Sequence, residues 1–408
     1  MKKILSLVLA LLVLVGCTAA FASCGNDEFK IGVICLHDEK STYDKNFIDA
    51  VNAAAETLGL TESQVILKTG IPETQACYDA AADLVDQGCK LVFADSFGHE
   101  SFMIKAAKKF PDVMFCHATG TQAESENLPN FFNAFASIYE GRYLAGVAAG
   151  MKLNELKEAG KLKGDAPKIG YVGAFTYAEV ISGYTSFLLG ARSVCPDVTM
   201  EVTFTGSWFD PTLESSAAKK LIENNCDLIS QHADSMGAPS ACEAVKPTPI
   251  PNVSYNVSTE TDCPNSFLIA SKINWAPYFE LIIKAVRDND GTIPHNYTGT
   301  LSTDSVQVTS FNSKVAAAGT EAKLTEVKNA LMAGTTHVFN LDSFTVGGNK
   351  LTVEYLKTLP SFKNLSDDVL TSLLADGYFH ESDYRSAPYF EFEIDGITLL
   401  DRNYGNDD

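Results

Sequence analysis

Carboxylates, hydroxyls and aromatic rings follow the apolar strands of this chain at the points where those strands end. The clearest example is the run at residues 90–93, which stops abruptly at Ala-Asp-Ser-Phe-Gly, residues 94–98. A short β-branched and aromatic run of this kind predicts a buried parallel strand and its exit loop. Open α/β sheets bind ligands outside the carboxyl ends of their strands. We therefore expect the side chains after the strands to surround one small molecule.

The residues at the predicted strand ends share one chemical character. Rings can stack on a flat ligand, which contributes about 0.5–1.5 kcal/mol for each pair beyond the buried area, and carboxylates accept hydrogen bonds from ring N–H groups or sugar hydroxyls. Lys272 is the only definite cation among them, and the sequence has no Gly-x-x-x-x-Gly-Lys-Ser/Thr phosphate loop. A nucleoside or nucleobase therefore fits better than a nucleotide. The candidate ligand-binding residues are Ser41, Tyr43, Asp44, Asp95, Phe97, Phe175, Tyr177, Trp208, Asp234, Asn256, Lys272 and Trp275.

Each candidate also has a purely structural explanation. Trp208 could equally be a core residue, and Asp210, which precedes a proline, is expected only to cap the next helix. Asp95 and Asp234 are stronger candidates, because a carboxylate directly after a buried strand needs a partner. Lys272 could form an ordinary salt bridge between two lobes. Phe97 and Phe175 are also of a residue type found more often in cores than in ligand sites. The hypothesis of a ligand site therefore depends on the convergence of many residues at strand ends.

No pattern typical of catalysis accompanies this set. The sequence has no Gly-x-Ser-x-Gly elbow, no His-Glu-x-x-His and no Gly-x-Gly-x-x-Gly that opens a helix. His117 and His232 could pair with Asp95 and Asp234, but without a nucleophile or a metal they are expected to be structural. The cysteines lack a metal-type spacing. We therefore predict no enzyme, no cofactor and no metal site.

The composition predicts a globular protein large enough for two domains. The chain has 408 residues, of which 46% are hydrophobic and 20% are charged. Its formal net charge of −20 disfavours a nucleic-acid partner, which would require a basic surface, and attraction to anionic lipid headgroups. Cys35, Cys89 and Cys116 lie in or beside apolar strands, where buried free thiols are expected. No disulfide pairing can be deduced from the sequence.

Residues 1–24 have the pattern of a lipoprotein signal peptide and tether, which do not belong to the fold. Two lysines precede an apolar run at residues 4–15, which is short for a membrane span. Leu-Val-Gly-Cys at residues 14–17 resembles a bacterial lipobox, so Cys17 is the favoured lipidation site and Cys24 is the alternative. The protein is then expected outside the cytoplasm, anchored to the cell membrane by lipid.

Strands and helices alternate twice along the chain, which predicts two doubly wound parallel sheets. The first series occupies residues 29–137 and the second occupies residues 138–265, so each half is large enough for one lobe. Residues 266–310 are expected to return to the first lobe and to form a hinge. Residues 311–408 are expected to complete the lobes. From residue 305 onwards, the pattern predicts strands at 305–311 and 390–394 and a helix at 320–332.

Four runs in the sequence carry a family resemblance. They are Tyr139–Gly150, Trp208–Pro211, Gln231–Ser235 and Asn274–Tyr278, and their order is preserved. In these runs the chain resembles the basic membrane protein (BMP) family, the substrate-binding lipoproteins of ABC importers, from about residue 29 to residue 287. The resemblance implies an α/β, type I periplasmic-binding-protein fold. Its two doubly wound parallel-sheet lobes, joined by a multi-strand hinge, would close on a purine nucleoside or a related base.

The resemblance also implies roles for individual residues. In the family an aromatic residue after the first strand stacks on the base, and Tyr43 stands at that place, with Asp44 where Asn is frequent. Asp95 matches a strand-end position near the ligand, and Lys272 matches the lysine of the returning strand. Many nucleoside-binding members carry an Asp that holds the ribose hydroxyls, and this chain has Asn256 there. That difference leaves room for a free nucleobase or another heterocycle.

We therefore predict a lipid-anchored solute-binding protein that delivers a purine nucleoside or nucleobase to ABC permease subunits and catalyses no reaction. Closure is expected to be a hinge motion. An extracellular nucleoside hydrolase is the first alternative, and release of ribose from inosine or adenosine would identify it. A ligand sensor for a membrane kinase is the second, and neighbouring genes for a permease and an ATPase would argue against it.

Overall fold

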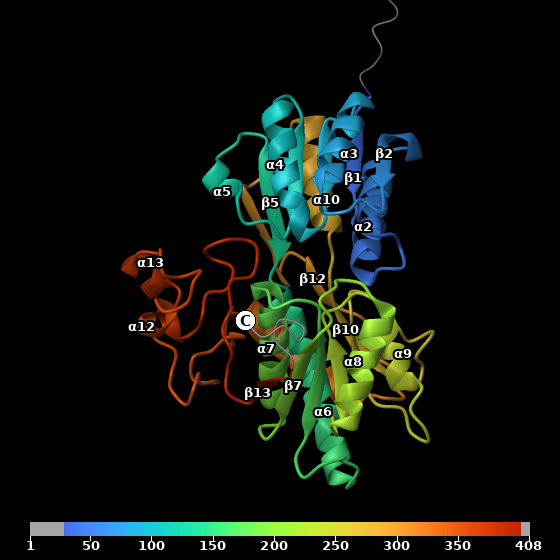
Figure 1. Cartoon of the computed structure of the whole chain (residues 1–408), viewed down its shortest axis with the longest axis vertical. Helices are drawn as coiled ribbons and strands as arrows, with labels where there is room; N and C mark the ends of the chain where they lie inside the picture. Colours follow the sequence, from blue (N-terminus) through green and yellow to red (C-terminus); the bar gives the residue numbers. More distant parts are fainter. Residues whose placement is uncertain (1–27, 401–408) are drawn as a thin grey trace, which may run out of the picture.

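The computed structural model describes residues 28–400 as two α/β lobes, one above the other (Figure 1). The N-lobe is built on a six-stranded sheet and the C-lobe on a seven-stranded sheet. Pairing is parallel throughout both sheets except between one pair of strands in the C-lobe. The predicted fold class, two parallel-sheet α/β lobes, is confirmed. The predicted signal peptide and the lipidation candidates Cys17 and Cys24 lie outside the described residues.

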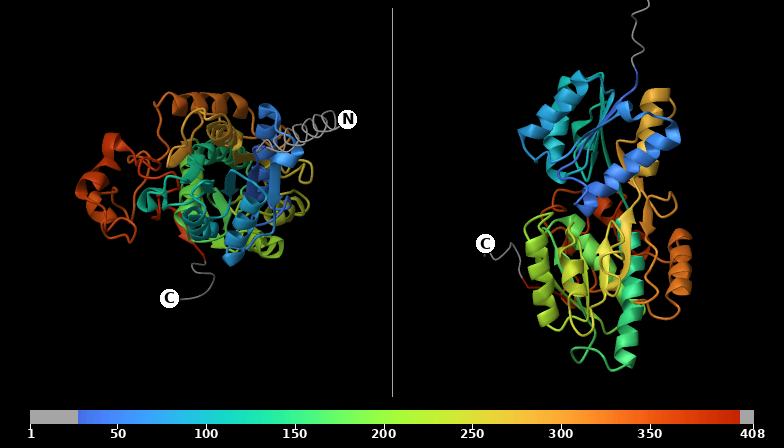
Figure 2. Two further views of the ribbon diagram at one scale, coloured as in Figure 1. Left: turned by 90° about the horizontal axis from the view of Figure 1, so that it is seen from above. Right: turned by 90° about the vertical axis from the view of Figure 1, so that its right-hand side faces the viewer.

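The N-lobe sheet has the strand order β11-β5-β4-β3-β1-β2, and helices cover both of its faces. Figure 2 shows α2 and α10 (blue and gold) on one side of this sheet and α3 and α4 on the other. Alternate side chains of β3 explain this arrangement, because Leu91 and Phe93 pack with α2 while Val92 and Ala94 pack with α3 and α4. The strands are β1 (Ile31–Ile34), β2 (Val65–Lys68), β3 (Leu91–Ala94), β4 (Met114–Ala118), β5 (Phe131–Ala136) and β11 (Asn296–Gly299), and the helices are α2 (Thr42–Leu58), α3 (Gln75–Asp86), α4 (Glu100–Lys109), α5 (Ala123–Glu126) and α10 (Ala276–Ile283).

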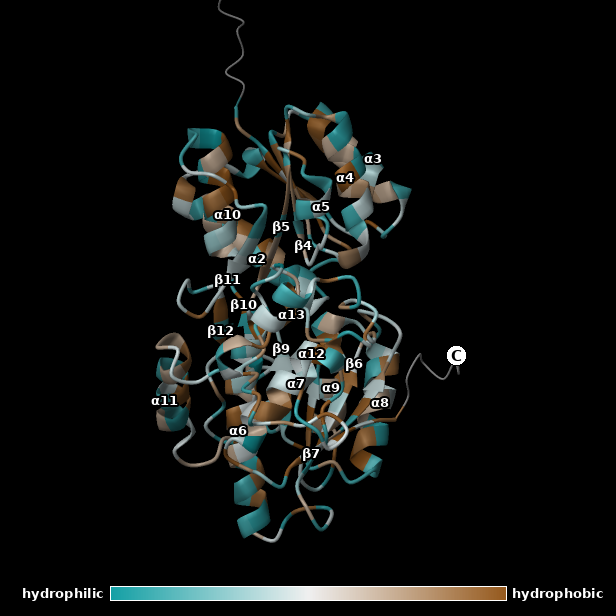
Figure 3. Cartoon of the chain, turned by 90° about the vertical axis from the view of Figure 1, so that its left-hand side faces the viewer, coloured by the Kyte–Doolittle hydropathy of each residue, from teal (hydrophilic) through white to brown (hydrophobic). Residues whose placement is uncertain are grey.

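The C-lobe sheet has the order β12-β10-β9-β8-β6-β7-β13. Its helices pack in two pairs, α6 with α7 and α8 with α9. Hydrophobic residues concentrate in the strands and on the helix faces that meet them, while the outer helix faces are hydrophilic (Figure 3). The strands are β6 (Lys168–Gly173), β7 (Thr199–Phe204), β8 (Leu228–Gln231), β9 (Asn252–Tyr255), β10 (Phe267–Ile273), β12 (Val306–Val308) and β13 (Ile397–Leu399), and the helices are α6 (Ile138–Glu158), α7 (Ala178–Arg192), α8 (Pro211–Glu223) and α9 (Gly237–Glu243).

The chain passes between the lobes after β5, after β10 and after β11. Within the segment predicted to return to the N-lobe, residues 266–310, β10 pairs with β9 and β12 in the C-lobe sheet. Only α10 and β11 join the N-lobe. Hydrogen bonds fasten two of the crossings: Asn46 donates to the carbonyl of Ile273 at 2.5 Å, and the Ser137 amide donates to the carbonyl of Gly299 at 2.7 Å.

The carboxy-terminal segment, residues 311–400, lies mainly beside the C-lobe (Figure 1). The helix predicted at 320–332 is confirmed as α11 (Thr320–Met332), and β13 adds an edge strand next to β7. The strand predicted at 390–394 is wrong. Phe390, Phe392 and Ile394 alternate in sequence and are all buried, but the backbone there has no strand partner. Core packing alone therefore produced the period of two. The segment also contains α12 (Val353–Leu356) and α13 (Asp367–Ser372).

Helices α6 and α7 approach closely because each carries glycine at the contact. A Cβ on Gly146 of α6 would clash with the backbone carbonyl of Phe187, and a Cβ on Gly190 of α7 would clash with that of Tyr143. Backbone atoms cannot move aside as the end of a flexible side chain can. The small residues at these positions therefore permit the close packing of the two helices.

We expect Gly146→Ala to lower the free energy of unfolding by about 2 kcal/mol, since the added methyl group overpacks the α6–α7 contact. Urea denaturation followed by circular dichroism would measure the change. Gly164→Ala is the matched control, because nothing lies within 4 Å of the methyl group that it adds. Equal stability of the two variants would contradict the close approach of these helices.

Candidate functional site

The strand ends of the two lobes face each other across a slot. It contains about 350 Å³ of space free of protein atoms, the solvent at its mouth included. Both lobes contribute rings and carboxyl groups, and no lysine or arginine lines the slot in the described part of the chain. The lining consists of Leu36, His37, Tyr43, Asp44, Ser96, Phe97 and Thr119 from the N-lobe and Glu179, Trp208, His232, Asp234 and Tyr255 from the C-lobe.

The structure brings Tyr43, Asp44, Phe97, Trp208 and Asp234 together in this lining, all of them predicted from the sequence. It places the other candidates elsewhere. Ser41 caps α2 and Asp95 is buried behind the lining, while Phe175 and Tyr177 stack on each other beside Trp208 with ring centroids 5.1 Å apart. Asn256 is buried, Lys272 lies on β10 opposite Gln307, and Trp275 stacks on Phe47 in the N-lobe core.

Several lining residues were missed by reasoning from strand ends. Tyr255 is the last residue of β9, so the strand-end signal pointed one residue too far, to Asn256. Glu179 lies in the first turn of α7, after the loop that held the predicted aromatic residues. His232 was expected to be structural. Ser96 and Thr119 also line the slot; both stand at predicted strand ends but were not chosen as candidates. Leu36 and His37 line it too and were not singled out from the sequence.

Hydrogen bonds hold the N-lobe side of the slot in place. The Asp44 carboxylate, in the first turn of α2, accepts from the backbone amide of His37 at 2.7 Å. The Asp95 carboxyl group accepts from the backbone amide of Leu36 at 3.1 Å, while its Oδ2 atom is buried without a hydrogen-bond partner. The Tyr43 hydroxyl donates to the Asp95 carbonyl at 2.9 Å. The Tyr43 ring is therefore fixed against the end of β3.

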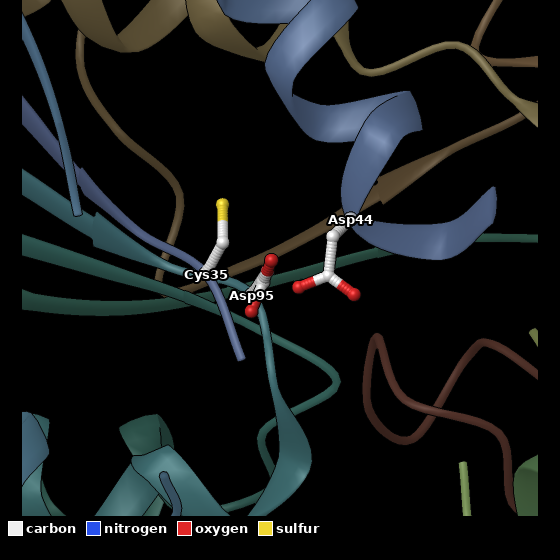
Figure 4. Close-up of side chains that lie close together, drawn as sticks. All are labelled: Cys35, Asp44 and Asp95. Atoms are coloured by element: carbon white, nitrogen blue, oxygen red, sulfur yellow. The ribbon is translucent and has the colours of Figure 1, made fainter. Parts of the chain in front are cut away.

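Asp44 and Asp95 lie close together but differ in their ionisation (Figure 4). Burial raises the pKa of Asp44, but hydrogen bonds from His37 and Ser41 outweigh it, so that the pKa is lowered overall. Burial and then repulsion from Asp44 raise the pKa of Asp95 well above its usual value. Of the two groups, the surroundings therefore favour the ionised form of Asp44 and the protonated form of Asp95.

Cys35 joins these two carboxyl groups in the one cluster of the described residues with ligand atoms close enough for a metal ion. The three ligand atoms lie within 4.8 Å of one another. Burial raises the pKa of the Cys35 thiol well above its usual value, and the pKa of Asp95 is raised too. Metal ligands of these types must be deprotonated. The cluster is therefore better described as a carboxyl pair beside a neutral thiol.

A buried arginine organises the C-lobe side. Arg142 on α6 donates to the carbonyl of Gln231 at 2.7 Å and to Nδ1 of His232 at 3.1 Å, and its guanidinium lies over the Tyr255 ring. Because Arg142 can only donate, Nε2 of His232 carries the proton and faces Glu179 at 3.3 Å. Burial and then Arg142 lower the pKa of His232 well below its usual value, so the ring is neutral. The positive charge of Arg142 thus stays behind the lining.

Asp234 lines the slot with a carboxyl group whose protonated form is favoured by its surroundings. Burial, followed by repulsion from Glu214, Asp44 and Glu179, raises its pKa well above the usual value. Its Oδ1 atom is buried and has no hydrogen-bond partner. A protonated carboxyl group offers one donor and one acceptor side by side. That pair can meet the edge of a heterocycle that carries an acceptor beside a donor.

The two lobes touch around the slot. The Thr42 amide at the start of α2 donates to the Asp234 carbonyl at 2.8 Å. The rings of Phe97 and Tyr177 pair across the lobes with centroids 5.3 Å apart, and His37 pairs with Phe209 at 5.4 Å. The conformation is therefore closed, and the lining groups of both lobes are within reach of one small molecule.

A family model described as "ABC transporter substrate-binding protein PnrA-like" (Bmp) matches residues 31–336. The most similar relatives include a purine-binding protein of Brucella abortus, 40% identical over 49% of this chain and 52% of its own length. Another is a putative ABC transporter glucose-binding protein of Haloferax volcanii, 32% identical over 48% of this chain and 46% of its own length. The chain thus aligns with about half the length of these curated relatives.

Among solved structures, an ABC transporter solute-binding protein from Aeropyrum pernix K1 matches with a TM-score of 0.63 and 16% identity, over 85% of this chain and 96% of that one. At this identity the match shows the fold alone. No helix within residues 28–400 is long and apolar enough to cross a membrane.

We expect Glu179→Gln to remove part of the pH dependence of stability. Burial raises the pKa of Glu179 to about 7, against the opposing effect of Arg142. The folded protein therefore keeps a proton that the unfolded chain has lost, and stability falls as the pH rises from about 4.5 to about 7. Between pH 5 and pH 8 this group accounts for a loss of roughly 2 kcal/mol. Urea denaturation at both pH values would measure it.

The control for this experiment is Glu56→Gln on the exposed face of α2. Its stability should follow the wild-type pH dependence. If Glu179→Gln lost as much stability as the wild type between pH 5 and pH 8, the proton on Glu179 would make no contribution to the pH dependence of stability.

Proposed function

Since the chain belongs to the Bmp family of PnrA-like ABC transporter substrate-binding proteins, we propose that it binds a purine base or nucleoside in the slot and presents it to an ABC permease. Membership of this family also means that the chain is a binding protein rather than an enzyme. The nucleoside hydrolase alternative is thereby set aside. We thus propose both which solute is bound and which residues bind it.

The slot lining is the observation that carries the proposal. Tyr43, Phe97 and Trp208 supply ring faces from both lobes, and the neutral carboxyl group of Asp234 supplies a donor beside an acceptor. A flat, uncharged heterocycle with ring N–H groups satisfies both features. A phosphate would meet the negative charge of Asp44 and no lysine or arginine in the lining. A base or nucleoside is therefore favoured over a nucleotide.

The relatives support the purine assignment in part. The Brucella abortus relative is named as purine-binding and the Haloferax volcanii relative as a putative glucose-binding protein. Glucose offers a puckered C–H face and hydroxyl groups, whereas a purine offers a flat aromatic ring system that stacks over its whole face and carries a donor beside an acceptor on its edge. The aromatic lining favours the purine, and calorimetric titration with adenine, hypoxanthine, adenosine, inosine and glucose tests the choice. Tight binding of glucose alone would overturn the proposal.

We further propose that lipid attached at Cys17, or alternatively at Cys24, anchors the protein to the outer face of the cell membrane. The proposal rests on the lipobox pattern of residues 14–17. Mass spectrometry of the amino-terminal peptide from the membrane fraction would identify the modified cysteine. An unmodified amino-terminal peptide from that fraction would contradict it.

We expect Tyr43→Ala and Trp208→Ala each to weaken purine binding roughly tenfold, because each removes a stacking face worth about 1.4 kcal/mol. Tyr43→Phe keeps the ring and loses only the hydrogen bond to the Asp95 carbonyl, so it should bind nearly as well as the wild type. Isothermal titration calorimetry measures all three. Unchanged affinity in both alanine variants would show that these rings do not contact the base.

We expect Asp234→Asn and Asp234→Leu to differ in affinity. Asn keeps a donor beside an acceptor and should bind purine within a few-fold of the wild type. Leu leaves polar ligand atoms unpaired and should weaken binding by about tenfold or more. The same calorimetric titration compares them. If Asn lost as much affinity as Leu, the ligand would require an ionised carboxylate at this position.

A further inference from the structure

A second groove opens beside the slot and shares part of its lining. Phe97, Thr119 and Glu179 belong to both. The groove contains about 1060 Å³ of space free of protein atoms, its open mouth included. Phe97 and Tyr177, whose rings pair there, remain 40% and 42% exposed. A ligand with its base in the slot can therefore extend into this groove along these rings.

The far wall of the groove comes from the carboxy-terminal segment, beyond the residues that the family model matches. This segment lies in front of the junction between the lobes in Figure 3, where α12 and α13 mark it. It also touches the N-lobe, since the Ser386 hydroxyl lies 3.3 Å from Oδ1 of Asn296 on β11. The wall is formed by Pro360, Ser361, Arg385, Ala387, Pro388 and Glu391.

The polar groups of this wall are held in place by the segment itself. Arg385 donates to the carbonyl of Pro388 at 2.9 Å, and its guanidinium lies 4.5 Å from the ring centroid of Tyr389. Glu391 accepts from the Ser361 hydroxyl at 2.6 Å. Arg385 retains further N–H groups and Glu391 retains further lone pairs. The wall therefore offers a fixed donor and a fixed acceptor to whatever enters the groove.

The chemistry of the groove suits an uncharged hydroxylated group. Arg385 shares this lining with the carboxyl group of Glu391, so the lining has no excess of positive charge for a phosphate. Hydroxyl groups both donate and accept, and they match a lining that mixes donors with acceptors. Two prolines and the exposed rings of Phe97 and Tyr177 can cover the C–H face of a sugar. The hydroxyls of Thr119, Thr121 and Thr176 add further partners.

We propose that the carboxy-terminal segment completes the ligand site with a second subsite, in which Arg385 and Glu391 bind a hydroxylated substituent, such as a sugar, on the base held in the slot. The inference rests on the proposed function, because it requires a base in the slot. It assigns recognition of the substituent to a part of the chain outside the matched family region. The segment is then a determinant of ligand choice.

The test is the ratio of nucleoside to base affinity, measured by calorimetry on the full chain with adenosine against adenine and with inosine against hypoxanthine. In Glu391→Gln and in Arg385→Ala we expect this ratio to fall about three- to tenfold, as for the loss of one or two hydrogen bonds. Glu354→Gln on the exposed side of α12, outside the groove, is the matched control and should leave the ratio unchanged. Unfolding curves check that each variant is folded.

An unchanged ratio in both groove variants would overturn the inference, because the substituent would then lie elsewhere. A parallel loss of base and nucleoside affinity would also overturn it, since the segment would then act on the slot as a whole. If the wild type bound neither bases nor nucleosides, the proposed function itself would fail. The base titrations of the wild type therefore separate the two failures.

Discussion

The burial of carboxyl groups around a slot without lysine or arginine in its described lining is the constraint on which the site depends. Asp44 remains ionised because His37 and Ser41 supply hydrogen bonds, whereas burial raises the pKa of Asp95, Asp234 and Glu179. Ionising all of them in so small a space would be strongly unfavourable. Burial therefore favours the protonated form of most of these carboxyl groups, which agrees with the uncharged ligand of the proposed function.

The fold makes this lining possible by keeping its one nearby arginine out of the slot. Arg142 lies on α6, one helical turn before Gly146, where α6 and α7 approach closely. From there its guanidinium reaches the end of β8 and donates hydrogen bonds to Gln231 and His232. These bonds hold the arginine behind the lining rather than in it.

Periodicity and strand ends were sufficient to predict the fold class, the helix at 320–332 and the expectation that Asp210 caps α8, which the structure confirms. The free buried thiols of Cys35, Cys89 and Cys116 are confirmed as well. Other features depend on packing between distant segments. The sequence pattern of strands and helices could not show that Trp275 stacks on Phe47. It also could not show that the alternating apolar residues near 390 fill a core without a strand partner. Nor could it bring Arg385 and Glu391 to the groove beside the slot, since that placement depends on how the carboxy-terminal segment packs against the lobes.

A molecule that contacts both lobes in the slot can stabilise their closed arrangement. Apart from the covalent crossings, the two lobes meet near the slot through the Thr42–Asp234 hydrogen bond and through ring pairs such as Phe97 with Tyr177. Ring pairs of this kind contribute about 0.5–1.5 kcal/mol each. A ligand can shift the balance between open and closed forms only by as much as it binds them differently. Because slot residues of both lobes line the same space, a molecule bound there contacts both lobes only in the closed form, and those contacts add directly to that difference.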